Sequence, residues 1–393
     1  MTEFGDQALL PAGFQDVLPP QAAQEAAVIE RLIACFFSHG YERVKPPLLE
    51  FEETILAGAG AAVAQQTFRL MDPVSQRMMG LRADMTPQVA RIAATRLHKA
   101  PRPLRLCYAG QVLRIKGGQL RPERQFAQVG AELIGATSER ADAEVVLLAA
   151  EALGAIGIAG LSIDLNMPPL VGALAAELDI DRERLAALRQ ALDRKDAAAV
   201  SEIAGSSSAI FQDLLRAAGP AEVALSRLKD MDLGEAAAAE VGRLTRVIAM
   251  IQSAAPGLTL TVDPAEHRGF EYQTGISFIL FARGVRGELG RGGRYATDPP
   301  AGPEPESATG FTLFMDSVQR GLPEPAPARR LYLPPDCSPA RGDELRGDGW
   351  ITLAGLDPTA DPTADPTADP TAEARRLGCS HALIDGAITA LED

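Results

Sequence analysis

The sequence predicts an α+β fold with more than one domain. Segments with alternating polar and apolar residues, joined by short turns, indicate β-hairpins, and apolar residues at helical spacing indicate helices between them. From residue 166 to residue 255 alanine and leucine dominate, and strands resume afterwards, which indicates a helical module inserted into a sheet domain. The chain has 393 residues, more than one hydrophobic core usually spans.

The first predicted elements are a helix over residues 20–39 and a strand over residues 41–50. Pro20 suits the first turn of this helix, and Gly40 suits its C-terminal cap. The apolar stripe of the helix is formed by Val28, Ile29, Leu32, Ile33 and Phe36. The Pro46-Pro47 pair in the strand favours a sheet edge or an interface over a central strand.

A hairpin over residues 66–82 and a helix from Thr86 to about Lys99 come next. Thr86 is the expected N-cap of this helix, and Pro87 is its expected first helical residue.

The hairpin over residues 105–135 carries the clearest sign of a binding site. Its two strands flank a Gly117-Gly118 turn. Because strand side chains alternate, one face of the second strand presents Gln128, Gly130 and Glu132, with room for a small ligand at the glycine. Arg114 can point into the same space from the first strand. Such a set suits an amino acid, although a solvated hairpin face would show the same pattern.

The later segments are predicted from composition. A helix over residues 139–153 precedes the helical module, and an alternating strand over residues 270–282 follows it. Glycines and arginines crowd residues 284–293, which indicates either an anion cradle or a tight hairpin turn. Four tandem DPTA copies over residues 357–372 indicate an extended polar spacer, to which we assign no function.

Composition excludes several classes of function. A net charge of −14 and a pI near 4.9 argue against nucleic-acid binding. The chain has no apolar run near the ~20 residues that cross a bilayer and no signal peptide at its N-terminus, so we expect a cytoplasmic protein. The cysteines are scattered, as are the four histidines, so we expect no disulfide framework, metal site or cofactor. The cysteines are Cys35, Cys107, Cys337 and Cys379.

Over about residues 8–320 these segments, in this order, resemble the catalytic core of histidyl-tRNA synthetases. The helix and strand of residues 20–50 resemble motif 1 of class II synthetases, and the hairpin of residues 105–135 resembles motif 2. RGFEYQTG at residues 268–275 and GGRY at residues 292–295 resemble histidine-specific motifs. The resemblance implies a class II aminoacyl-tRNA synthetase-like, mainly antiparallel sheet of six or seven strands, flanked by helices, and a dimer formed through the motif 1 region.

The resemblance also divides the chain into four segments. They are the first part of the core (1–165), a helical insertion (166–257), the second part of the core (258–325) and an abbreviated α/β C-terminal region with the DPTA repeats (326–393).

The resemblance further implies a pocket for histidine. Asp84, Thr86 and Gln128 would meet the α-ammonium, and Glu132 would read the imidazole. Gln273 stands where the family has a tyrosine. Read from the residues alone, Asp84 could instead support the start of the following helix, and Arg268 could form an ion pair at the sheet edge. The whole predicted set is Asp84, Thr86, Arg114, Gln128, Glu132, Arg268, Gln273 and Tyr295.

Departures from the family lie at its ATP site. Lys116 replaces the glutamate of motif 2, Ser317 replaces the arginine of motif 3, and Phe314 replaces a motif glycine. Transfer chemistry on phosphates depends on fixed cations around them, so these changes should abolish adenylation.

A core that keeps its amino-acid pocket and loses its ATP site resembles a paralogous family, the regulatory subunits of ATP phosphoribosyltransferase. The resemblance implies a subunit without its own catalysis, a homodimer within a hetero-oligomer. It would be required by a short-form catalytic subunit for the first step of histidine biosynthesis, and L-histidine would be the feedback ligand. The short C-terminal region and the acidic charge argue against a tRNA partner. A divergent active histidyl-tRNA synthetase is the alternative, and recruitment to another role is a third possibility.

Overall fold

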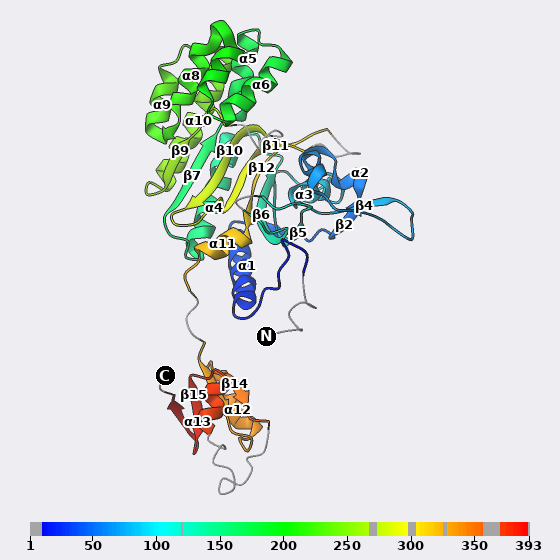
Figure 1. The fold of residues 1–393 in the computed structure, drawn as a ribbon, viewed down its shortest axis with the longest axis vertical. Helices are drawn as coiled ribbons and strands as arrows, with labels where there is room; N and C mark the ends of the chain where they lie inside the picture. Colours follow the sequence, from blue (N-terminus) through cyan, green and yellow to red (C-terminus); the bar gives the residue numbers. More distant parts are fainter. Residues whose placement is uncertain are drawn as a thin grey trace. The chain divides into compact units, whose positions relative to one another are not determined.

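The computed structural model describes residues 10–118, 121–266, 273–297, 304–324, 328–356 and 370–391. The chain divides into two compact units, Met1–Pro323 and Glu324–Asp393 (Figure 1). The predicted site residue Arg268 lies outside the described residues, as do the DPTA copies up to residue 369.

A nine-stranded sheet forms the centre of the first unit (Figure 1), with the strand order β1-β5-β6-β12-β11-β10-β7-β9-β8. Only the pairs β1/β5 and β7/β9 are parallel, so the sheet is mainly antiparallel, as predicted. The two strands beyond the expected seven are two-residue edge strands, β1 and β8. In sheet order the bounds are Glu42–Arg43, Leu104–Leu113, Gln125–Ile134, Ser307–Phe314, Gly290–Ala296, Gln273–Ala282, Leu161–Asn166, Thr259–Val262 and Gly219–Pro220.

Helices α1 (Gln21–Ser38) and α4 (Glu139–Ala155) pack against each other and against strand β6. The side of α1 that faces the core holds the fully buried Leu32 and Phe36, because apolar residues recur there at helical spacing. Phe36 meets Phe311 of β12 edge to face, with ring centroids 5.5 Å apart. These helices cover one face of the sheet and form its larger core.

Helix α3 (Thr86–Thr95) packs against β6, and its residues belong to a second cluster of buried side chains. The predicted N-cap role of Thr86 is wrong. Met85 is the N-cap, without a side-chain cap bond, and the Thr86 hydroxyl is used elsewhere.

Between β7 and β9 the chain forms a group of helices at the β7–β9 end of the sheet (Figure 1). Their buried residues are continuous with the core under the sheet, so the helices extend that core rather than forming a separate one. They are α5 (Pro168–Glu177), α6 (Arg182–Asp193), α7 (Ala197–Ala204), the 3₁₀ turn η3 (Gly205–Ser207), α8 (Ser208–Ala217), α9 (Ala221–Lys229) and α10 (Glu235–Ala254).

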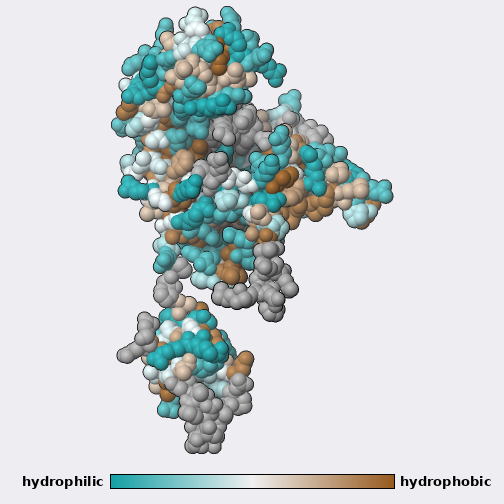
Figure 2. Space-filling view, in the orientation of Figure 1, coloured by the Kyte–Doolittle hydropathy of each residue, from teal (hydrophilic) through white to brown (hydrophobic). Residues whose placement is uncertain are grey.

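A three-stranded antiparallel sheet, β2-β4-β3, lies beside α2 (Glu52–Ile55). Its strands are Leu49–Phe51, Met78–Leu81 and Arg69–Met71, and the 3₁₀ segment η2 (Gly58–Gln66) precedes β3. Hydrophobic side chains gather on the surface over this sheet (Figure 2), including Met71, which is 63% exposed. The remaining helix of the first unit is α11 (Met315–Gly321).

The second unit is a four-stranded sheet, in the order β14-β13-β15-β16, with two helices. Its strands β13 to β16 are Arg330–Leu333, Ile351–Ala354, His381–Ile384 and Ala387–Ala390, and its helices are α12 (Pro339–Gly347) and α13 (Pro370–Arg376). Among the described residues of either unit, none of the helices has both the length and the apolar character required to cross a membrane.

Candidate functional site

The centre of the site is Glu132, which lies near the C-terminal end of β6 and is 1% exposed. Three hydroxyl groups donate hydrogen bonds to it. Thr86 Oγ1 and Tyr108 Oη reach Oε1 at 2.9 and 3.3 Å, and Tyr295 Oη reaches Oε2 at 3.1 Å. Side chains from α3, β5, β6 and β11 therefore meet at one buried carboxyl group.

Burial raises the pKa of Glu132 to about 8, and the charge of Asp84 acts in the same direction. The hydrogen bonds from Thr86, Tyr295 and Tyr108 oppose this shift but do not cancel it. Near neutral pH the group therefore carries a proton in the unliganded protein. It can donate a hydrogen bond in that state and accept one after it loses the proton.

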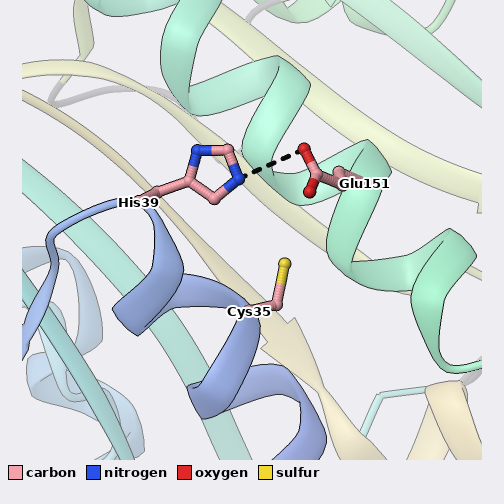
Figure 3. A group of neighbouring side chains, drawn as sticks. All are labelled: Cys35, His39 and Glu151. Atoms are coloured by element: carbon pink, nitrogen blue, oxygen red, sulfur yellow. Dashed lines mark ion pairs between the residues drawn. The ribbon is translucent and has the colours of Figure 1, made fainter.

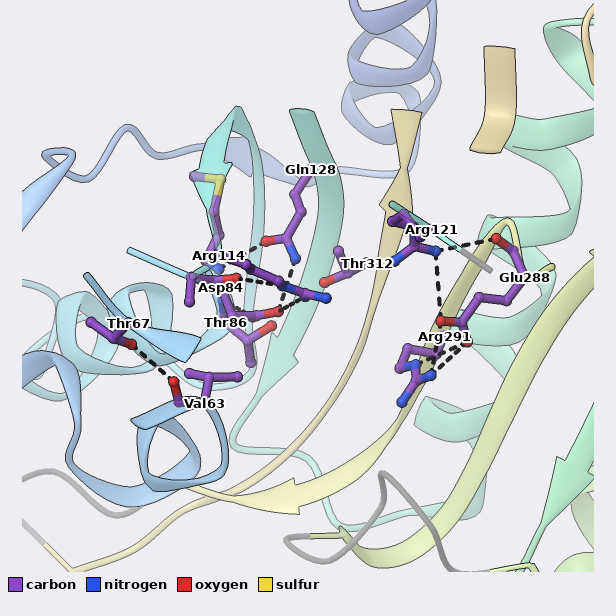
Figure 4. A network of polar contacts seen from close by, with 12 residues as sticks. Val63, Thr67, Asp84, Thr86, Arg114, Arg121, Gln128, Glu288, Arg291 and Thr312 are labelled. Atoms are coloured by element: carbon purple, nitrogen blue, oxygen red, sulfur yellow. Dashed lines mark hydrogen bonds and ion pairs between the residues drawn. The ribbon is translucent and has the colours of Figure 1, made fainter. Parts of the chain in front are cut away.

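A second polar group adjoins the first at the start of α3 (Figure 4). Gln128 Nε2 donates to Asp84 Oδ2 at 2.8 Å, and Gln128 Oε1 accepts the Met85 N–H at 2.9 Å. Asp84 Oδ1 accepts the Thr86 N–H at 3.0 Å, so Asp84 supports the first turn of the helix and still faces the site. Arg114 Nη2 lies 4.0 Å from Asp84 Oδ2.

These groups line a cavity of about 260 Å³, just below the roughly 300 Å³ at which the usual range for ligand sites begins. Six of the eight predicted residues line it: Asp84, Thr86, Arg114, Glu132, Gln273 and Tyr295. Gln128 is fully buried behind Asp84, and Arg268 lies outside the described residues.

The prediction that Gly130 leaves room for a ligand is wrong. A Cβ atom at this position would lie 2.4 Å from Tyr108 Oη and 2.3 Å from the Phe311 carbonyl oxygen. The missing side chain makes room for the tyrosine, which pairs with Gly130 across the two strands. The glycine that leaves space for the Glu132 side chain is Gly310, where a Cβ atom would lie 1.8 Å from Glu132 Oε2.

Sequence reasoning missed Tyr108 and Thr312, whose hydroxyl oxygens are 2.6 Å apart. Tyr108 could have been predicted, because it is an even number of residues from Arg114 along the strand and therefore faces the same side of the sheet. Thr312 could not be found in this way, because it comes from β12, far along the chain.

Beside the first cavity lies a larger one, of about 960 Å³, which shares Arg114, Glu288 and Arg291 with it. Lys116 and Ser317 line this second cavity. Two of its arginines share one acidic partner (Figure 4): Glu288 forms ion pairs with Arg121 at 3.6 Å and with Arg291 at 2.7 Å.

Phe314 lines the first cavity, not the second, and is 3% exposed. Its ring meets Phe126 edge to face, and the guanidinium carbon of Arg121 lies 3.8 Å from its centroid. Arg121 Nε also lies 3.0 Å from Asp316 Oδ2. The aromatic ring and the acidic residues therefore hold Arg121 in place.

The glycine-rich segment between β10 and β11 is a hairpin turn, with positive φ angles at Gly284 (82°) and Gly287 (85°). Of its arginines, Arg286 is exposed and Arg291 lines the cavities. Arg294 is buried on the opposite side of the sheet in an ion pair of 2.9 Å with Asp142. The segment therefore supplies one arginine to the site, not a cradle of three.

The chain is similar over nearly its full length to proteins that share one name, and a family model matches most of it. The family model described as histidyl-tRNA synthetase matches residues 13–318. The ATP phosphoribosyltransferase regulatory subunit of Paramagnetospirillum magneticum is 55% identical over 392 residues, covering 100% of both chains. That of Rhodospirillum centenum is 55% identical over 386 residues, covering 98% of this chain and 97% of its own. That of Gluconobacter oxydans is 44% identical and covers 99% of both chains.

Two solved structures share the fold. An ATP phosphoribosyltransferase regulatory subunit/histidyl-tRNA synthetase from Bacillus halodurans superposes with a TM-score of 0.78 at 24% identity, covering 92% of this chain and 95% of its own. A histidine–tRNA ligase subunit from Alicyclobacillus acidocaldarius superposes with a TM-score of 0.64 at 30% identity, covering 80% of this chain and 96% of its own.

Proposed function

Because the chain belongs to the family of ATP phosphoribosyltransferase regulatory subunits, we propose that it is a non-catalytic subunit that senses L-histidine on behalf of a catalytic subunit. The observation that carries the sensing role is the cavity around Glu132. A buried carboxyl group there faces open space beside Asp84 and Arg114.

The proposed ligand matches this cavity group by group. The imidazole would face Glu132 and Tyr295, and the α-ammonium would face Asp84. The carboxylate is expected at Arg268, which lies outside the described residues. The cavity is small, and its lining combines the neutral Glu132 with both an acidic and a basic side chain, Asp84 and Arg114. These properties suit a zwitterion with a compact polar side chain.

Because Glu132 carries a proton, the site should bind an imidazole in preference to an apolar side chain. A protonated carboxyl group donates to the unprotonated nitrogen of neutral imidazole, and the pair then shares one proton whichever group carries it. A ligand with an alkyl side chain would leave the O–H of the protonated carboxyl group without an acceptor, which is costly in a buried site.

The second cavity supports the absence of catalysis. Adenylation needs cations that are free to hold a polyphosphate. Here Arg121 is held by Asp316 and Glu288, and the position of the motif 3 arginine is Ser317, whose hydroxyl accepts a bond from Arg320 Nη2 at 2.9 Å. A nucleotide would have to break these pairs before it could bind.

The partner follows from the family name. A regulatory subunit of ATP phosphoribosyltransferase implies a complex with the catalytic subunit, which we propose is the short form. We further propose a homodimer through α1 within that complex, a cytoplasmic location and no tRNA partner. Histidine would act by favouring one state of the complex, for which a coupling free energy of ~1–3 kcal/mol is sufficient.

The test is the phosphoribosyltransferase assay of the short catalytic subunit with and without this chain, across a titration of L-histidine. We expect activity to require the chain and to fall with histidine. For the Glu132→Ala variant we expect the half-inhibiting concentration to rise about tenfold or more, because the ring loses its hydrogen-bond partner. Glu202→Ala, the same substitution at an exposed position in α7, is the matched control.

The alternative is a divergent active histidyl-tRNA synthetase, with which the matching family model is compatible, although the names of the relatives favour the regulatory subunit. It predicts histidine-dependent exchange between ATP and pyrophosphate by the purified chain. Such exchange would overturn the non-catalytic proposal, and a complex whose activity did not respond to histidine would overturn the sensing proposal.

A further inference from the structure

Three side chains that can ligate a metal meet where α1 ends beside α4 (Figure 3). Cys35 lies in the last turn of α1, His39 is the C-cap residue of that helix, and Glu151 comes from α4. The Cys35 Sγ, a His39 ring nitrogen and a Glu151 carboxylate oxygen all lie within 4.8 Å of one another. The imidazole Nε2 of His39 is 3.2 Å from Glu151 Oε2.

Two elements of the fold create this cluster. Residues four apart on a helix lie on the same side, which puts Cys35 and His39 next to each other. The packing of α1 on α4 then brings Glu151 to them. The sequence shows the Cys35–His39 spacing, but nothing in it joins that pair to a residue more than a hundred positions away.

The three ligand types suit a borderline-soft divalent cation. Thiolate, imidazole and carboxylate all bind Zn²⁺, at ~2.0–2.3 Å, which puts ligand atoms roughly 3.5 Å apart in a tetrahedral site. The present separations of up to 4.8 Å therefore have to shorten by about 1 Å. The side chains of His39 and Glu151 are 37% and 58% exposed, so rotation about their side-chain bonds can supply this movement without repacking the core.

The charges around the cluster also favour a cation. Burial and the negative charge of Glu151 raise the pKa of the Cys35 thiol. Glu144 lies on the same face of α4, two turns before Glu151, and forms an ion pair with Arg105. In the metal-free protein His39 Nε2 lies 3.2 Å from the Glu151 carboxylate, and the Cys35 thiol lies beside the same carboxylate.

We propose that Cys35, His39 and Glu151 form a zinc site with three protein ligands and water at the fourth position. When the hydrated ion binds, the thiol proton and the proton between His39 Nε2 and Glu151 Oε2 pass to solvent, and Zn–S, Zn–N and Zn–O bonds replace three bonds from the ion to water. The ion would join the C-terminal end of α1 to α4. Both helices belong to the core on the face of the sheet away from α3.

The test uses the full, reduced chain and Co²⁺ as a spectroscopic probe for Zn²⁺. We expect a thiolate-to-cobalt charge-transfer band in the near ultraviolet that saturates at one equivalent and disappears when Zn²⁺ is added. Cys35→Ser should abolish the band, while His39→Gln and Glu151→Gln should weaken binding about tenfold or more. Cys337→Ser is the control, because Cys337 is a partly exposed free thiol in the second unit.

A second readout does not depend on whether the variants fold. In the wild-type chain, one equivalent of Zn²⁺ should slow alkylation of Cys35 about tenfold or more and leave alkylation of Cys337 unchanged. The proposal is overturned if Zn²⁺ protects neither thiol or both equally, or if the cobalt band survives in Cys35→Ser. Neither result would affect the proposed histidine site, because the cluster shares no residue with the cavity around Glu132.

Discussion

The pH dependence of histidine binding gives the sharpest test of the proposed site, because it depends on one proton held by Glu132. The pKa of this group is about 8 in the unliganded protein, and that of free imidazole is about 6.5. The complex holds one proton between the two groups. Between these values the unliganded protein supplies the proton from Glu132, and binding proceeds without proton uptake or release.

The magnitude follows from the pKa of Glu132. With a value of about 8, the group is roughly nine-tenths protonated at pH 7 and one-tenth protonated at pH 9. The affinity for histidine should therefore fall about tenfold from pH 7 to pH 9 through this group alone, or about 1.4 kcal/mol. Below pH 6.5 the affinity should also fall, because the ligand must then lose a proton.

Glu132→Gln isolates this effect. The amide can still donate to the ring, but it has no proton to lose. Titrations of the ligand itself affect both proteins equally, so they cancel in the ratio of the wild-type to the variant affinity. That ratio should fall about tenfold between pH 7 and pH 9.

The assay is isothermal titration calorimetry with L-histidine across this pH range, in two buffers that differ in ionisation enthalpy. At pH 9 the wild-type protein should take up about 0.9 more protons per histidine than Glu132→Gln does. A ratio of affinities that stays flat from pH 7 to pH 9, with equal proton uptake by both proteins, would refute the reasoning about Glu132.

The remaining predictions concern stability and the shape of the cavity. Because the pKa of Glu132 is raised, its contribution to stability is complete below about pH 4.5 and is lost as the pH rises to about 8, so Glu132→Gln should gain stability relative to wild type over that range in thermal melts. Gly310→Ala should abolish histidine binding in calorimetry, since its Cβ would lie 1.8 Å from the Glu132 carboxylate. Tyr108→Phe should lower the free energy of unfolding in urea by about 1–3 kcal/mol, because Thr312 and Glu132 lose a buried partner. Arg294→Met should cost about 3–5 kcal/mol in the same measurement, because it leaves the carboxylate of its ion pair buried and unpaired.

Controls separate these outcomes from general damage. Gly154→Ala, in α4, is matched to Gly310→Ala, because no atom other than those of its own helix backbone and chain neighbours lies within 4 Å of the added Cβ. It should bind histidine as the wild type does. Normal histidine binding by Gly310→Ala, or wild-type stability of Arg294→Met in urea, would contradict the geometry described for those positions.

The sequence predicted the elements near the site well because they depend on local patterns. Strand alternation places Gln128 and Glu132 on one face of β6, and a helix begins at Thr86, as its position before Pro87 suggests. The use made of Thr86 was not predictable in the same way. Thr-Pro is typical of a helix start whether or not the hydroxyl caps it, and the competing acceptor, Glu132, comes from another strand.

Long-range packing explains the other errors. The prediction of ligand space at Gly130 is wrong because a sequence shows that a side chain is missing but not which neighbour fills its place. The structure fills that space with the ring of Tyr108. The β6–β12 pairing, which places Gly310 against Glu132, joins residues far apart in the chain, so no local pattern predicts it.

The two adjoining cavities differ in how their charges are balanced, and this difference argues for an amino acid over a nucleotide. In the larger cavity Arg121 lies between Asp316 and Glu288, so a polyphosphate would have to displace carboxylates that already neutralise the cation. Breaking such partly buried pairs leaves unpaired charge, which costs several kcal/mol. In the smaller cavity the buried Glu132 is neutral near pH 7, and its partners are hydroxyl groups rather than cations. A neutral imidazole can therefore enter without breaking an ion pair at that end, and the charged contacts of the ligand are expected at its ammonium and carboxylate groups, away from Glu132.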